Sequence, residues 1–232
     1  MNWELHPKMN EKLYLRNPEQ SEIGKNMIKK SINLIRKLGF EAFTFKKLAE
    51  EIPTTEATVY RYFENKHRLL SYVVAWYWHW LDYQVMFKTN NLKSSAEKIK
   101  VINQILTWQM DEEHTVIDDI SLEDLHQIII YESSKVYLTK HVTEDNQYQL
   151  FKPYKNLCAR ISNIFKDFNP DYPYTRSLAS TIIEMAHFQD FFMTHLPALT
   201  DFAETKSLKN VNDFLNSLVF SALEKKVKAT SN

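Results

Sequence analysis

Residues 55–62 gather side chains that can bind the polar edges of nucleic-acid bases and phosphates. Their sequence, Thr-Glu-Ala-Thr-Val-Tyr-Arg-Tyr, carries hydroxyl groups and one guanidinium, which form hydrogen bonds with phosphate oxygens and base edges. In a helix, Val59 and Phe63 lie four residues apart and face inward together. A short helix pinned in this way has the form needed to enter a DNA major groove. The polar side chains expected on its outer face are Thr55, Thr58, Tyr60, Arg61 and Tyr62.

Two further helices must position this segment. Residues 21–38 place isoleucines on one stripe, and Gly39 suits the left-handed conformation that follows a helix end. Thr44 is expected to cap a second helix over residues 45–52, which Pro53 ends because proline cannot donate a backbone hydrogen bond. The pattern predicts three short helices ahead of a longer one.

Residues 23–70 resemble the DNA-binding domain of the TetR family of bacterial regulators. The match is carried by Gly39-Phe40-Glu41-Ala42-Phe43-Thr44, by Leu48-Ala49-Glu50, and by TEATVYRYFENKHRLL from Thr55 to Leu70. The resemblance implies that Thr55 and Glu56 begin the recognition helix, and that a further set of residues approaches the DNA, mostly at phosphates. Lys66 stands at the start of the next helix, where its charge and the helix N-terminus could both meet a phosphate. The implied DNA-approaching set is Thr44, Thr58, Tyr60, Tyr62 and Lys66.

Two positions depart from the family pattern. The family commonly has Gly where Pro53 stands, so the geometry of the turn is expected to differ slightly. Glu56 replaces a basic or small residue; an acid there stabilises the helix dipole by about 0.3–1 kcal/mol but repels phosphate. Glu56 therefore either tunes base choice or weakens binding. The alternative function is a helical small-molecule sensor that has lost DNA binding and acts through a protein partner.

Charge is unevenly distributed along a chain whose net charge is zero. Residues 21–70 hold ten Lys and Arg against six Asp and Glu, which gives +4. Residues 1–20 hold three of each sign, so residues 71–232 carry −4. This asymmetry directs one end of the molecule toward phosphates.

The chain is expected to be all-α. It contains only two glycines in 232 residues, and its apolar residues recur at three and four positions. We predict a helix-turn-helix domain over residues 1–70, with its N-terminal extension, and a helical ligand-binding and dimerisation bundle over 71–232, joined by a shared helix. The predicted helices are 21–38, 45–52, 56–63, 66–88, 95–110, 121–140, 149–167, 174–195 and 207–227.

The second domain is expected to bind a small molecule and to dimerise. Trp76, Trp80 and Tyr83 share one helical face and could wall a pocket for a flat apolar, aromatic or cationic ligand; plain aromatic core packing is the competing interpretation. The last two long helices carry broad apolar stripes, and we expect them to form a homodimer. A dimer would set two recognition helices about one DNA turn apart, on a palindromic operator. The expected function is a repressor that its ligand releases from DNA.

Other classes of function have less support. Glu184 and His187, three residues apart with His195 further on, could begin a metal site, but no second such pair follows. No phosphate loop, dinucleotide fingerprint or nucleophile elbow occurs, so we expect neither an enzyme nor a cofactor. Cys158, the single cysteine, cannot form an internal disulfide. The start of the chain does not resemble a secretory signal and no stretch could cross a bilayer, so the protein is expected in the cytoplasm.

Overall fold

The computed structural model describes residues 7–109, 116–117 and 120–224. The chain divides into two compact units: the first is Met1–Trp80 with Glu112–Pro153, and the second is Leu81–Asp111 with Tyr154–Asn232. Helix α4 (Lys66–Thr89) runs from the first unit into the second. The described part is helical as predicted, apart from one antiparallel strand pair, β1 (Val116–Ile117) with β2 (Ile120–Ser121).

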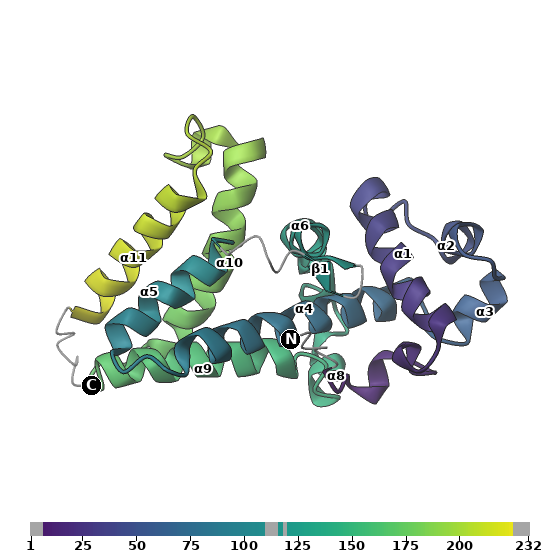
Figure 1. The fold of residues 1–232 in the computed structure, drawn as a ribbon, viewed down its shortest axis with the longest axis horizontal. Helices are drawn as coiled ribbons and strands as arrows, with labels where there is room; N and C mark the ends of the chain where they lie inside the picture. Colours follow the sequence, from purple (N-terminus) through teal and green to yellow (C-terminus); the bar gives the residue numbers. More distant parts are fainter. Residues whose placement is uncertain (1–6, 110–115, 118–119, 225–232) are drawn as a thin grey trace. The chain divides into compact units, whose positions relative to one another are not determined.

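The first unit opens with a segment, residues 7–20, that we call the N-terminal strap. It contains two short 3-10 helices, η1 (Glu11–Leu13) and η2 (Pro18–Gln20), shown in purple in Figure 1. The side chains of Met9 and Leu13 are buried, so the strap has its own apolar anchors in the unit.

Helix α1 (Glu22–Leu38) follows the strap and is bounded at both ends by local chemistry. The hydroxyl of Ser21 accepts a hydrogen bond from the Gly24 amide at 3.2 Å and caps the first turn. At the other end Gly39 has φ +76°, a left-handed conformation that glycine adopts without a steric penalty. The isoleucine stripe that the sequence predicted is buried: Ile28, Ile32 and Ile35.

Helices α2 (Phe45–Glu51) and α3 (Glu56–Tyr60) complete the helix-turn-helix, and Figure 1 shows them grouped with α1. Phe45, Leu48 and Ala49 are the buried residues of α2, because they repeat with helical spacing on one face. The predicted extent of the third helix, to residue 63, was too long, since α3 ends at Tyr60.

Residues 122–147 also belong to the first unit, although the sequence-based boundary placed everything after residue 70 in a second domain. They form α6 (Leu122–Glu132), α7 (Ser134–Tyr137) and α8 (Val142–Gln147). The predicted single helix 121–140 is interrupted at Ser133, where Val136 donates its amide to the Ser133 carbonyl three residues back at 2.9 Å. That tighter bond replaces the four-residue helical repeat.

The second unit contains α5 (Ser95–Leu106), most of α9 (Lys152–Phe168), α10 (Thr175–His195), the short η4 (Pro197–Leu199) and α11 (Leu208–Glu224). Its core is aliphatic, with Phe165 as a fully buried ring. Arg160 binds both carboxylate oxygens of Asp82, at 2.6 and 3.1 Å, which ties α9 to the end of α4. In the described part of the chain, no helix combines the length and apolar character needed to cross a bilayer.

Candidate nucleic-acid interface

The outer face of α3 is polar and accessible. Thr55, Glu56 and Arg61 are exposed, whereas Val59 is fully buried beneath them. The Tyr60 ring is 48% exposed and meets the ring of Phe45 on α2 edge to face, with centroids 4.9 Å apart. This contact packs the ring against α2 while nearly half of the residue stays accessible to solvent.

Two threonine hydroxyls start the helices of the motif. Thr44 accepts a hydrogen bond from the Lys47 amide at 3.2 Å, and Thr55 accepts one from the Thr58 amide at 3.3 Å. The hydroxyls of Thr55 and Thr58 also lie 3.1 Å apart. A hydroxyl has one donor and two acceptor sites, so one hydrogen of this pair can still be donated outward. Thr58 is half-buried, while Thr44 and Thr55 are exposed.

The structure corrects the prediction that Tyr62 lies on the outer face. Its side chain is only 1% exposed, and its hydroxyl lies 2.7 Å from the hydroxyl of Ser21. The helical spacing that placed it outside fails because α3 ends at Tyr60. The N-terminal strap then covers the ring, with the Leu15 amide donating to the Tyr62 carbonyl at 2.8 Å.

Lys66 also differs from its predicted role. Its ammonium donates to the carbonyls of Phe40, Glu41 and Phe43 at 3.0, 3.1 and 3.3 Å. It also lies over the Phe40 ring, 4.6 Å from the centroid. A lysine has three donors, so the prediction that this ammonium is available to a phosphate is wrong. Lys66 instead fixes the turn that leads into Thr44.

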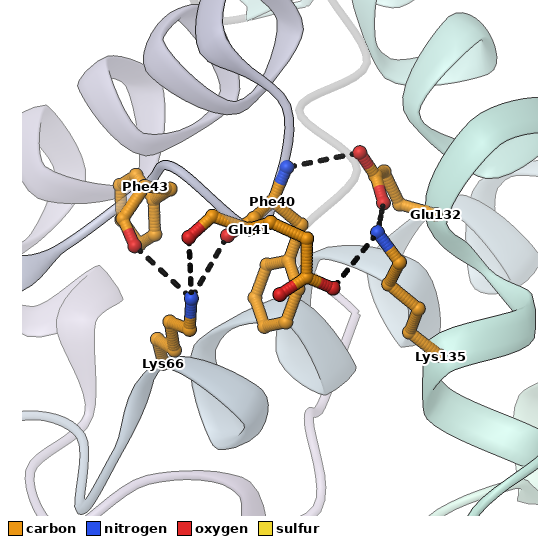
Figure 2. A network of polar contacts seen from close by, with 6 residues as sticks. All are labelled: Phe40, Glu41, Phe43, Lys66, Glu132 and Lys135. Carbon is orange, nitrogen blue, oxygen red and sulfur yellow. Dashed lines mark hydrogen bonds and ion pairs between the residues drawn. The ribbon is translucent and has the colours of Figure 1, made fainter.

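The same turn is held on its other side by α6 and α7, as Figure 2 shows. Glu132 is 7% exposed, and its carboxylate accepts the Phe40 amide at 2.9 Å and the Lys135 ammonium at 2.6 Å. Lys135 also pairs with Glu41 at 3.2 Å. Residues 92 positions apart therefore share one polar network, and nothing in the sequence pattern pointed to Glu132 or Lys135.

The ionisation of this network follows from its geometry. Burial acts to lower the pKa of Lys135, but its hydrogen bonds to Glu132 and Glu41 outweigh that effect and raise it. The pKa of Glu41 is lowered, first by its hydrogen bond to Lys135 and then by the charge of that ammonium. Glu41 and Lys135 therefore form a charged pair at neutral pH.

An open pocket of about 190 Å³ borders this network between α1 and α6. Apolar and polar side chains both line it, and one of the polar ones, Arg36, pairs with Asp124 at 3.6 Å. Its lining residues are Ile35, Arg36, Gly39, Gln127, Ile128, Tyr131 and Glu132.

The predicted ligand-binding aromatics do not share one environment. Trp76 and Trp80 are buried in the first unit. Tyr83, in the second unit, is half-buried and stacks on Phe87 with centroids 6.0 Å apart. The neighbouring aromatic residues of α4 contact α6 and α7: the His126 ring nitrogen lies 2.8 Å from the Tyr77 hydroxyl, and Trp78 donates its indole N–H to Tyr137.

The residues considered for a metal site are used within the protein. Tyr154 donates its hydroxyl to Glu184 at 2.7 Å. His187 is buried, and desolvation lowers the pKa of its ring to about 4. Among the residues that the structure describes, no group of three or more His, Cys, Asp or Glu side chains could hold a metal ion.

Helices α10 and α11 present apolar side chains to solvent as well as to their core. Phe188 is 50% exposed and stacks on Phe192, with centroids 5.8 Å apart. Three further apolar residues of this region are also exposed: Leu196, Leu199 and Phe214.

Comparison with known proteins identifies part of the chain and the fold of most of it. The sequence profile for bacterial regulatory proteins of the tetR family matches residues 28–73. No curated protein matches the sequence significantly.

Solved structures of the same fold include three regulators. AibR in complex with isovaleryl coenzyme A and operator DNA has a TM-score of 0.59 and 13% identity, over 84% of this chain and 97% of that one. FadR, a fatty acid degradation regulator from Bacillus halodurans, has a TM-score of 0.58 and 15% identity, over 84% of this chain and 93% of that one. A putative tetR family transcription regulator from Shewanella sp. PV-4 has a TM-score of 0.53 and 12% identity, over 90% of this chain and 96% of that one.

Proposed function

Because the chain belongs to the TetR family of bacterial regulatory proteins through residues 28–73, we propose that it is a repressor that binds a palindromic operator as a homodimer and leaves it when a small molecule binds. Release requires the small molecule to bind the DNA-incompetent state more tightly than the DNA-bound one.

The observation that carries this proposal is the outer face of α3. Thr55, Tyr60 and Arg61 stand in solvent over a buried Val59, so the polar groups are held on a supported helix rather than on a loose loop. A helix held in this way loses little freedom on binding. Thr44 at the start of α2 is a further exposed residue whose hydroxyl could bind the phosphate backbone.

The homodimer is supported by the exposed phenylalanines of α10 and α11. Phe188 and Phe214 are 50% and 37% exposed, and rings exposed on two neighbouring helices are typical of a surface that a partner covers. A twofold axis through these helices would pair two recognition helices on two half-sites.

The effector is proposed to be an apolar or acyl-bearing small molecule. Support comes from the aromatic content of α4 and from AibR, which has the same fold and was crystallised with isovaleryl coenzyme A. Binding near Trp76 or Trp80 would change the emission of these buried indoles. Fluorescence titration with isovaleryl coenzyme A, free fatty acids and planar aromatic compounds therefore tests this part of the proposal.

The DNA proposal is tested by fluorescence anisotropy with labelled duplexes from the neighbourhood of the gene. We expect selective binding to one fragment, with an affinity that falls steeply as salt increases because counterions are released from the DNA. The double variant Tyr60→Ala/Arg61→Ala should lose selectivity while keeping its fold by circular dichroism.

The matched control is Tyr174→Ala/Arg176→Ala, which removes an exposed tyrosine and an exposed arginine from the second unit. It should bind the fragment as the wild type does. Absence of binding to every fragment would instead favour a sensor that works through a protein partner, in which Glu56 repels the DNA.

A further inference from the structure

The N-terminal strap lies outside the residues that match the family, which begin at 28. It nevertheless packs on the helix-turn-helix by several specific contacts. Glu19 accepts the Tyr72 hydroxyl at 2.8 Å, and the Leu15 amide donates to the Tyr62 carbonyl at 2.8 Å. The strap is therefore a packed part of the proposed DNA-binding domain.

Gly24 shows how closely the strap approaches α1. A Cβ atom at this position would lie 2.3 Å from the carbonyl oxygen of Pro18, a distance that no side chain can occupy. One of the two glycines in the chain thus stands where the strap needs close contact between two backbones.

The strap hides Tyr62 and places Arg16 over it. The guanidinium of Arg16 lies 5.1 Å from the centroid of the Tyr62 ring, while its side chain stays exposed. Tyr62 lies two residues beyond the end of α3, next to the exposed Arg61. The exposed cation of Arg16 therefore lies over the segment that directly follows the recognition helix.

We propose that Arg16 binds a DNA phosphate beside the recognition helix, in place of the buried Tyr62. This inference rests on the proposed function. A guanidinium beside a ring can still donate from its N–H groups, and these groups bind phosphate oxygens in pairs. The contact carries no base information, so it adds to affinity and to register rather than to sequence choice.

The test compares wild type with Arg16→Ala by anisotropy on the preferred fragment and on an unrelated duplex, at several salt concentrations. Loss of one charge-assisted contact should weaken binding by about tenfold on both DNAs. The slope of log affinity against log salt should fall by about 0.9, the value for one phosphate.

Two matched variants separate contact from other effects. Arg176→Ala removes an exposed arginine from α10 and should leave both affinity and slope unchanged. Arg16→Lys keeps the charge without the planar fork and should restore the slope while recovering only part of the affinity.

Three outcomes would overturn the inference. In the first, Arg16→Ala binds as tightly as the wild type. In the second, its affinity falls but its salt slope stays at the wild-type value, which would mean that Arg16 holds the strap in place and does not contact a phosphate. In the third, the wild type binds no DNA, and the proposed function fails as well. Selective wild-type binding together with an unchanged Arg16→Ala variant would sink this inference alone.

Discussion

Two parts of the helix-turn-helix are held in different ways. Helix α3 is fixed by its own neighbours in sequence: Thr55 caps it and Val59 anchors it. The turn of residues 40–43 is instead held by side chains from distant helices, Lys66 on α4 and Glu132 on α6. The recognition helix is thus held by residues close to it in sequence, whereas the turn that leads into α2 depends in part on Glu132, which lies outside the family-matched residues 28–73.

The difference separates two kinds of failure. A defect in the local anchors of α3 should unfold the motif, because buried apolar area is lost. A defect in the distant polar contacts should leave the helices formed but loosen the backbone of the turn, because the buried rings of Phe40 and Phe43 still anchor it in the core. Stability and DNA affinity should then change together in the first case and separately in the second.

The largest effect is expected for Phe63→Ala. Phe63 is fully buried, and truncating a buried phenylalanine costs about 3–5 kcal/mol. Urea unfolding followed by circular dichroism measures the loss. The control Tyr60→Ala removes a ring that is 48% exposed, so it should cost far less stability and act mainly on DNA binding. If Phe63→Ala and Tyr60→Ala lost equal free energies of unfolding, the distinction between buried anchors and exposed contact residues would be wrong.

The next effect tests the distant support. Glu132→Ala leaves the Phe40 amide without its acceptor and should cost about 1–3 kcal/mol. Amide exchange measured by NMR should speed up at Phe40 while α3 amides stay protected. Glu132→Gln keeps a carbonyl oxygen at this position, so the Phe40 amide should stay protected although the charge is gone. Exchange that accelerates throughout α3 in Glu132→Ala would show that the turn and the helix are one unit.

The same contrast explains what could be predicted from the sequence. The ends of α1, α2 and α10 were placed within one residue, because helix boundaries follow from caps, prolines and a glycine that lie close along the chain. The all-α class and the exposed positions Thr55 and Tyr60 followed from the spacing of apolar residues.

The features that were missed depend on contacts between distant segments. Tyr62 was placed outside because a helix was extended past its actual end and because the strap that covers the ring gave no periodic signal. The sequence predicts a phosphate contact for Lys66, since a lysine at a helix start can have that role when no carbonyls compete for it. The pairing of Glu132 with Phe40 spans 92 residues, and no single-sequence pattern encodes such a pair.

A smaller effect concerns the cap of α2. Thr44→Ala removes the acceptor of the Lys47 amide and should cost about 1 kcal/mol. Thr44→Ser retains the hydroxyl and should restore both stability and DNA affinity. If Thr44→Ala keeps its thermal midpoint but loses DNA affinity, the hydroxyl binds DNA rather than capping α2. The start of α2 would then not depend on its local cap.

The smallest effect is a pH dependence confined to the turn. Hydrogen bonding to Lys135 holds the pKa of Glu41 below its ordinary value of 4.5 in the folded protein. A carboxylate with a lowered folded pKa stabilises the protein above its unfolded pKa, and this contribution is lost as pH falls through the folded pKa. Lys135 stays charged throughout, since its pKa is raised. Urea unfolding of wild type and Glu41→Gln should therefore differ at about pH 6 and converge by about pH 3, because other acid-titrating groups are common to both proteins. A difference that stays constant over this range would show that the charge of Glu41 does not cause it, and that the ion pair with Lys135 adds nothing to stability.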